Sequence, residues 1–241
     1  MTAQDRHLSD RSNLFLVIMV CVLALGFRLL FFDQLVLPNP VRADAREYAV
    51  YAYNLVTHGT YSKEYPAEAP QPDAWRSPGY PLVVALSMLI GGLKHYYSIM
   101  IYFQIVISTL CVAMTYFLGR RLIPNWASLS AAVFVALSPH LISTSSNLLT
   151  ETLFSFMLLA GIYAYYCALE MKRATVFLIS GLLFGYAYLT NETGLLIPWI
   201  FALVTIYLRK VQGDRSTFKR NIWLVGGLLI IFCLVIPKIK L

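Results

Sequence analysis

The segment LFLVIMVCVLALGFRLLFF at residues 14–32 carries a single charged side chain, Arg28, in an apolar run. About 20 apolar residues are needed for a helix to cross the hydrocarbon core of a membrane, so this run predicts a membrane-spanning helix. We expect Arg28 to extend its charge toward the nearer membrane surface. The whole chain is 59% hydrophobic and 13% charged, whereas soluble domains are about a quarter charged. The sequence therefore predicts an integral membrane protein.

Further apolar runs predict an all-α protein with about seven spans. The predicted spans cover residues 14–32, 99–118, 126–142, 148–169, 174–190, 193–208 and 222–237. Residues 33–98 are expected to form a large first outer loop with short interfacial helices. Because the chain has no internal repeat and no soluble segment, residues 1–241 are predicted to be a single membrane domain.

The apolar run GYPLVVALSMLIGGL at residues 79–93 is too short for a span. As a helix it would reach about 22 Å, against about 30 Å of hydrocarbon. Pro81 near its start and the Gly91–Gly92 pair at its end shorten it further. We therefore expect a helix that lies at the membrane surface or dips into it.

The lysine and arginine residues set the predicted orientation, because cytoplasmic loops carry an excess of them. With residues 79–93 at the surface, the basic segments at 119–125, 170–173 and 209–220 become inner loops and most carboxylates fall outside. This predicts a multi-pass protein of the plasma (inner) membrane with its active site on the outer, periplasmic side. The net charge of +7 does not indicate nucleic-acid binding, because the basic residues form no single stripe.

The charged stretch RADAREY at residues 42–48 opens the outer loop. A helix from Asp44 onward would place four residues on one stripe facing the membrane domain: Asp44, Tyr48, Tyr51 and Leu55. An acid at the head of this stripe would be partly desolvated, which favours a general base. The alternative is structural, because Asp44 and Glu47 have the spacing of a capping box. We expect Arg42, Arg46 and Glu47 to form a solvated face rather than a site.

The segment DAWRSPGYP at residues 73–81 places Arg76 just before the short apolar helix, close to Trp75 and Tyr80. A guanidinium at a membrane surface suits a phosphate, because its planar fork binds two oxygens at once. Arg76 beside Trp and Tyr is equally typical of an interfacial anchor. Both interpretations stay open on the sequence.

Three further polar residues fall on the predicted outer side. Glu151 lies one turn inside a predicted span, where a charge is costly and usually faces a functional cavity; otherwise it complements the helix dipole. His140 would join that cavity or simply be hydrogen-bonded, and Glu192 interrupts the chain between two predicted helices. We expect five of these residues to converge on one outer face of the protein: Asp44, Glu47, Arg76, Glu151 and Glu192.

Five stretches in order resemble the GT-C-type glycosyltransferases that use polyprenyl-phosphate sugars, a family that includes protein O-mannosyltransferases and the aminoarabinose transferases of lipid A. The stretches are DAREYAVYAYNLVTHGTYS (44–62), WRSPGYPLVVAL (75–86), YFLGRRL (116–122), LLTETLF (148–154) and GLLFGYAYLTNETGLLIP (181–198). The chain departs from the family at LTNET, where members often have LTRPT. It also ends at IPKIKL, where members usually continue, so we expect a fragment or a short variant completed by a partner subunit.

The resemblance implies inverting transfer of a sugar from a polyprenyl-phosphate carrier to a glycan, lipid or protein acceptor at the outer membrane face. Asp44 resembles the family's catalytic base, Arg76 and Tyr80 the residues near the carrier phosphate, and Glu151 an acid near the site. The remaining candidate substrate-binding residues are Glu47, His140 and Glu192. A divalent metal ion would share the phosphate charge, with candidate ligands Asp44 and Glu151.

Two other functions stay open. Acids within helices are typical of ion pathways, and the break at residues 191–192 resembles a discontinuous helix, which together favour a transporter or lipid flippase. The third hypothesis is a non-catalytic partner subunit, or a truncated one.

Overall fold

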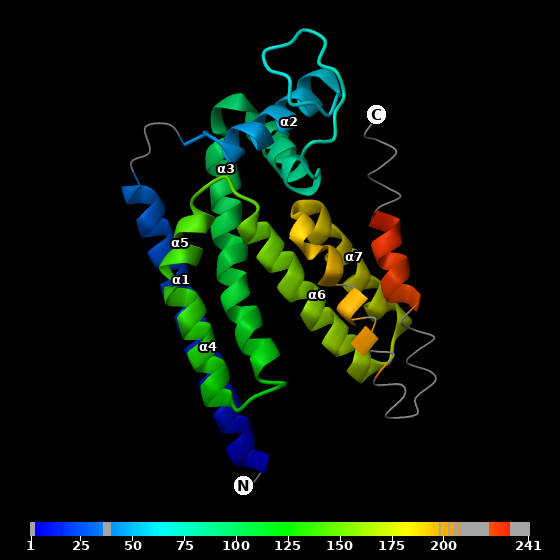
Figure 1. Cartoon of the computed structure of the whole chain (residues 1–241). Helices are drawn as coiled ribbons and strands as arrows, with labels where there is room; N and C mark the ends of the chain where they lie inside the picture. The colour runs from blue at the N-terminus through cyan, green and yellow to red at the C-terminus, as the bar shows by residue number, and fades with distance from the viewer. Residues whose placement is uncertain are drawn as a thin grey trace.

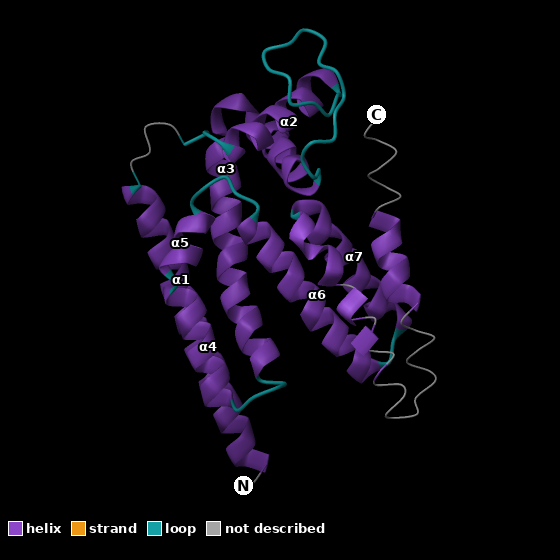
Figure 2. Cartoon of the chain, viewed as in Figure 1, coloured by secondary structure: helices purple, strands orange, loops and turns teal. Residues whose placement is uncertain are grey.

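The computed structural model describes residues 3–35, 40–197, 199–201, 203–204, 207 and 222–231, with the side chains of residues 3–12 excepted. Within these ranges the chain consists of helices and loops without a strand (Figure 2). The elements in order are α1 (Ala3–Gln34), α2 (Asp44–His58), α3 (Gly79–Gly119), α4 (Asn125–Leu137), α5 (Pro139–Ser145), α6 (Glu151–Met171), α7 (Ala174–Thr190) and the 3₁₀ helix η1 (Glu192–Leu196). The predicted all-α class therefore holds for the described residues.

Three described helices, α1, α3 and α6, are long and apolar enough to cross a membrane, and the number rises to four if the bent pair α4–α5 is one span. The helix predicted at residues 174–190 coincides with α7. Residues 222–231 are helical, whereas parts of the spans predicted at 193–208 and 222–237 lie outside the described residues. The prediction of seven spans therefore stays a prediction.

The α1 helix packs beside α3 and α4 (Figure 1). We predicted that its Arg28 would extend toward the membrane surface, but the side chain lies inside the bundle instead. The guanidinium is fully buried. It donates from Nε to Ser108 Oγ at 2.8 Å and from Nη1 to the carbonyl oxygens of Ala24 at 3.0 Å and Ala136 at 3.2 Å. A buried charge is tolerated when its donors are hydrogen-bonded. Because α3 and α4 supply acceptors at this depth, Arg28 has no need to extend outward.

The α3 helix is broken at Gly92, where the backbone takes φ 63° and ψ −177°. A left-handed φ of this kind is cheap only for glycine. The first arm, before Gly92, lies beside α2 at one end of the molecule, and the second arm runs down the bundle (Figure 1). Tyr80, Val84 and Met88 of the first arm belong to the same buried apolar cluster as Tyr48 of α2. The short helix predicted at residues 79–93 is therefore the first arm of α3.

The α4–α5 pair replaces the straight helix predicted at residues 126–142. The two helices bend by 53° at Ser138, because Pro139 lacks the N–H that a continuous helix would need. The Ser138 hydroxyl accepts from the Leu141 N–H at 3.5 Å and so caps α5. Beyond α5 the chain turns into α6, which pairs closely with α7.

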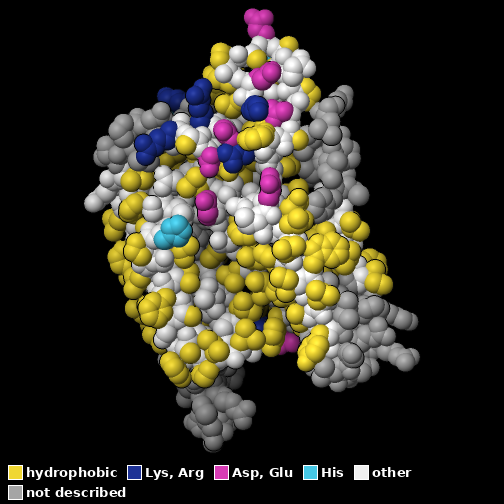
Figure 3. Space-filling model, viewed as in Figure 1, with side chains coloured by type: hydrophobic (Ala, Val, Ile, Leu, Met, Phe, Trp, Pro, Cys, Tyr) yellow, Lys and Arg dark blue, Asp and Glu magenta, His cyan; other side chains and the backbone are white. Residues whose placement is uncertain are grey.

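Charged side chains gather at the α2 end of the molecule. In Figure 3 the Lys, Arg, Asp and Glu side chains of the visible face lie mainly around α2 and the neighbouring loop, above a broad belt of apolar side chains over the helical bundle. This separation places the polar chemistry at one end of the apolar bundle.

Candidate functional site

Arg76 joins the loop before α3 to the start of α2. Its Nη2 lies 2.7 Å from Asp44 Oδ1 and its Nε lies 2.5 Å from Glu47 Oε2. The two carboxylates are neighbours because residues three apart share a helix face. The guanidinium carbon also lies 5.4 Å from the centroid of the Tyr48 ring. Burial by itself would lower the pKa of Arg76, but the Glu47 hydrogen bond and the charge of Asp44 outweigh it and raise that pKa above its ordinary value.

Asp44 is not the helix cap that its spacing suggests. Ala43 occupies the N-cap position, and no side chain caps the start of α2. The Asp44 side chain is 56% exposed, so the desolvation expected from its stripe is not found. Glu47, which was also consistent with a solvated face, is instead the second partner of Arg76. A guanidinium within reach is a stronger partner for a carboxylate than a neutral backbone N–H, which explains both differences.

Two tyrosines and an aspartate fix the loop that carries Arg76. The Tyr61 hydroxyl donates to the Arg76 carbonyl oxygen at 2.9 Å, and its ring stacks on that of Tyr51 with 4.3 Å between centroids. The Tyr51 hydroxyl donates to Asp73, which also accepts from the Trp75 N–H at 3.0 Å. Burial alone would raise the pKa of Asp73, but these hydrogen bonds hold it below its ordinary value. Sequence reasoning missed this support because no local motif signals it.

A cavity of about 560 Å³, here named the Arg76 cavity, opens beside the guanidinium. Its lining residues are Tyr48, Trp75, Arg76, Ser77, Thr150, Thr190, Asn191, Glu192 and Thr193. They come from α2, the loop before α3, the start of α6 and the turn between α7 and η1. Ligand pockets typically measure about 300–1,000 Å³, so the cavity can hold a sugar with its phosphate.

The structure brings most of the predicted site residues to this cavity, but not all. Glu192 lines it and accepts from the Ser77 hydroxyl at 3.0 Å, while Asp44 and Glu47 reach it through Arg76. Glu151 is the exposed first residue of α6, directly after a lining threonine. Asp44, Glu47, Arg76, Glu151 and Glu192 therefore lie around one end of the bundle.

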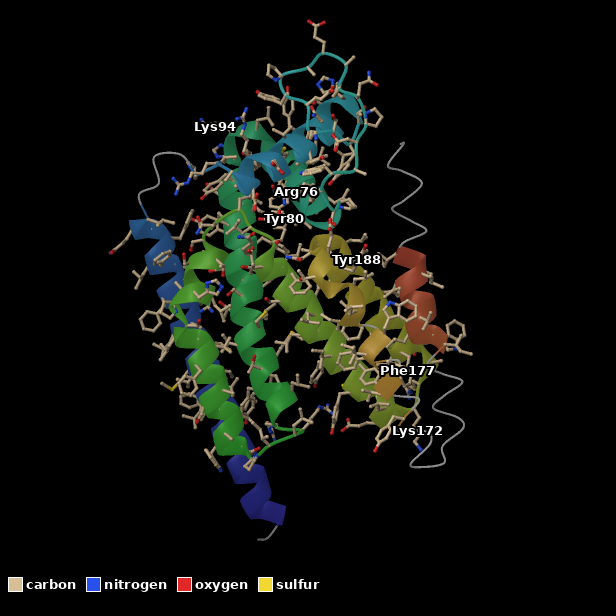
Figure 4. The ribbon with its side chains drawn as sticks, viewed as in Figure 1. Arg76, Tyr80, Lys94, Lys172, Phe177 and Tyr188 are labelled. Atoms are coloured by element: carbon tan, nitrogen blue, oxygen red, sulfur yellow. The ribbon has the colours of Figure 1, made fainter. Side chains whose placement is uncertain are left out.

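Tyr80 and His140 do not line the Arg76 cavity. Tyr80 is fully buried, and its hydroxyl donates to Gln104 Oε1 at 2.5 Å. Its ring meets the ring of Tyr48, a lining residue, edge-on at 5.0 Å, and Figure 4 labels Tyr80 close to Arg76. His140 is exposed on α5. The Tyr80 hydroxyl is engaged by the buried acceptor of Gln104, and a contact between Tyr80 and substrate stays a prediction.

Neutral polar residues of the cavity were not singled out from the sequence. Asn191, noted from the sequence for the helix break and for the departure from the LTRPT pattern, caps η1 by accepting from the Thr193 N–H at 3.1 Å. Its Nδ2 also approaches Thr150 Oγ1 at 3.4 Å and so joins the end of α7 to the start of α6. The usable signal was the paired LLTETLF and LTNET segments, each with threonines flanking a glutamate.

The donor set does not fit a metal ion held by the protein alone. In the described part of the chain, no three His, Cys, Asp or Glu side chains come together as ligands. Glu192, which lines the cavity, accepts from Ser77, and Asp44 and Glu47 are both engaged by Arg76. We therefore derive no step through the divalent ion suggested for Asp44 and Glu151.

A separate cavity of about 250 Å³ lies within the bundle, between α3, α5 and α6. Its described lining residues include Ser108 and Thr152 but no charged side chain. Charged side chains therefore line the Arg76 cavity but not this one.

A family model matches the greater part of the chain. The model of the family described as dolichyl-phosphate-mannose-protein mannosyltransferase matches residues 75–240, which include Arg76 and η1 but not α2. A search among curated proteins found no match. The predicted resemblance is confirmed, and the chain is a multi-pass membrane glycosyltransferase of the GT-C type. Because the match covers well over half of the sequence, the chain belongs to the dolichyl-phosphate-mannose-protein mannosyltransferase family.

Proposed function

We propose that the chain moves a sugar from a polyprenyl-phosphate carrier to a glycan, lipid or protein acceptor at the outer face of the plasma (inner) membrane. The observation that carries this proposal is the Arg76 cavity, where a guanidinium and two carboxylates meet at one end of an apolar bundle. A carrier with an apolar tail and a charged head would place its phosphate at such a boundary.

Arg76 would bind the carrier phosphate. Its Nε and Nη2 contact Glu47 and Asp44, whereas its Nη1 meets no acceptor within the described residues. The phosphate would take this free edge of the guanidinium or displace Glu47. As the bond to the sugar breaks, negative charge grows on the leaving phosphate oxygen, and a fixed cation beside it lowers the barrier.

Asp44 would act as the general base. Only its Oδ1 is engaged by Arg76, and the side chain is exposed enough for an acceptor to reach Oδ2. Asp44 would remove the proton from an acceptor hydroxyl or amine. The freed lone pair would then bond to the anomeric carbon from the side opposite the phosphate, and the carbon–oxygen bond to the phosphate would break. Glu192 and the hydroxyls of Ser77 and Thr190 would bind the sugar hydroxyls.

The test compares Asp44→Asn with Glu47→Gln in the full chain. Both variants remove one carboxylate charge from the same guanidinium, but only Asp44 is assigned as the base. In membranes supplied with dolichyl-phosphate mannose as first donor, released dolichyl phosphate and transferred sugar are measured. Loss of a general base costs about 10²- to 10⁴-fold, so Asp44→Asn should nearly abolish transfer.

Glu47→Gln should retain most of the transfer, and both variants should keep nearly the wild-type thermal stability in detergent, since partly exposed ion pairs contribute little. Equal activity of the two variants would show that Asp44 is not the base. Movement of the intact carrier-linked sugar across the membrane, without its cleavage, would favour the flippase hypothesis instead.

A further inference from the structure

The opposite side of α2 lines a second outer cavity of about 270 Å³, here named the Arg46 cavity. Four of its lining residues form a helical stripe at i, i+3, i+4 and i+7: Arg46, Ala49, Val50 and Tyr53. The facing wall comes from the region around the break in α3, with Met88, Leu93 and Tyr96. The Arg46 cavity thus shares α2 with the Arg76 cavity, but it uses the other face of that helix.

One cation lines the Arg46 cavity, and two others adjoin its lining residues in the sequence. Arg46 lines it, while Arg42 and Lys94 directly follow the lining residues Val41 and Leu93. All three cationic side chains are exposed, and none of them forms an ion pair within the described residues. Figure 3 shows Lys and Arg side chains gathered on this side of the α2 end, where Figure 4 labels Lys94. An anion at the Arg46 cavity would therefore meet charges that no carboxylate neutralises.

An exposed apolar stripe leads away from the Arg46 cavity. Leu86, Leu89, Ile90 and Leu93 recur at helical spacing on the first arm of α3, and each side chain is more than half exposed. Leu93 belongs both to this stripe and to the cavity wall. Contiguous exposed apolar side chains at a membrane protein's polar end are suited to contact lipid chains rather than water.

We propose that the Arg46 cavity binds the phosphate of an anionic membrane phospholipid, whose acyl chains lie along the stripe from Leu86 to Leu93. The cationic side chains at the Arg46 cavity favour an anionic ligand, because basic pockets at a membrane surface attract lipid phosphates. The apolar stripe selects a lipid over a soluble phosphate, since a soluble ligand would leave it uncovered. The bound lipid holds α2 at the membrane surface. This inference does not depend on the proposed sugar transfer.

The experiment uses the full chain in nanodiscs made from equal parts phosphatidylglycerol and phosphatidylcholine. Native mass spectrometry measures which lipid stays bound after release of the protein. The wild type should retain phosphatidylglycerol in preference. Arg46→Gln should lower that preference about tenfold, the effect of losing one charge-assisted hydrogen bond, while Arg46→Lys should keep most of it. Arg173→Gln, which removes one exposed arginine charge from the α6–α7 turn, is the matched control and should behave as wild type.

Equal retention of the two lipids by the wild type would overturn the proposal, as would equal preference in Arg46→Gln and Arg173→Gln. Displacement of the bound lipid by water-soluble glycerol phosphate at equal concentration would overturn the lipid assignment. Arg46 is exposed and glutamine is a good helix former, so Arg46→Gln should fold. Unchanged sugar transfer in Arg46→Gln separates this result from a failure of the proposed function.

Discussion

The two faces of α2 carry opposite charges and use them differently. The acidic face presents Asp44 and Glu47, and both carboxylates are already paired with Arg76. The basic face presents Arg46, which has no such partner in the described residues. One helix of fifteen residues thus separates a site whose charges are mutually fixed from a site whose charge is available to a ligand.

This difference follows from what each face meets. The acidic face packs toward the loop before α3, which Asp73 and the stacked tyrosines hold in place, so Arg76 is positioned before any substrate binds. Preorganised charge of this kind suits catalysis, because the cost of arranging it is met during folding. The basic face meets the end of the first arm of α3 at the Gly92 break, where apolar side chains are exposed and where the proposed headgroup binding needs charge but little fixed geometry.

The strongest test of this division is Arg76→Gln. The substitution removes the cation proposed to stabilise the leaving phosphate, and loss of one such group costs about 10²- to 10³-fold in turnover. Transfer measured with dolichyl-phosphate mannose should fall by that amount. The preference of the Arg46 cavity for phosphatidylglycerol should stay at the wild-type value. If both properties fall together, α2 responds as a unit and the two faces are not independent.

The packing substitution Gly79→Ala should displace the backbone beside the Arg76 cavity and so lower the stability of the fold. A Cβ at residue 79 would lie 2.7 Å from the backbone carbon and oxygen of Leu189 and 2.8 Å from the nitrogen of Thr190, which lines the Arg76 cavity. The Tyr186 hydroxyl also donates to the Gly79 carbonyl oxygen at 2.9 Å, so this contact cannot open freely. Overpacking of this kind costs about 1–3 kcal/mol, measurable as a lower thermal midpoint in detergent.

The control for this substitution is Gly26→Ala in α1, where a Cβ would meet nothing within 4 Å. Alanine favours a helix over glycine, so Gly26→Ala should be neutral or slightly stabilising. Equal destabilisation by both substitutions would mean that the close approach of α3 to α7 does not support the Arg76 cavity.

Features that depend on local spacing could be predicted from the sequence. The stripe expected along α2 is found in the burial of Tyr48 and Tyr51, because a helical period places residues by number alone. The break between the short apolar helix and the following long helix lies at Gly92, as the Gly91–Gly92 pair suggested. The apolar runs were sufficient to predict an all-α membrane protein.

Features that depend on distant partners could not be predicted. Arg28 stays buried because its acceptors lie on α3 and α4, far along the chain. Asp44 does not cap α2, because its carboxylate pairs with Arg76, which lies thirty-two residues later in the chain. Tyr80 does not line the cavity, and its hydroxyl donates a hydrogen bond to Gln104. In each case the local pattern offered a sensible partner and the tertiary fold supplied a stronger one.

The smallest expected effect is a pH dependence of thermal stability that arises from Asp73, on the side of the acidic face alone. Asp73 supports the acidic face through Tyr51, and its pKa in the folded chain lies below the ordinary value because hydrogen bonds favour the ionised form. A carboxyl with a lowered folded-state pKa stabilises the fold fully above its unfolded pKa, and this contribution is lost as pH falls through the folded pKa. The wild type should therefore lose thermal stability on acidification more steeply than Asp73→Asn, by less than about 1 kcal/mol because the group is partly exposed.

The measurement is the difference between the two thermal midpoints from neutral pH downward, which cancels the titration of all other acids. Parallel midpoint curves would show that the Asp73 charge does not hold the loop, and that Arg76 is positioned by Tyr61 and the carboxylates of α2 alone.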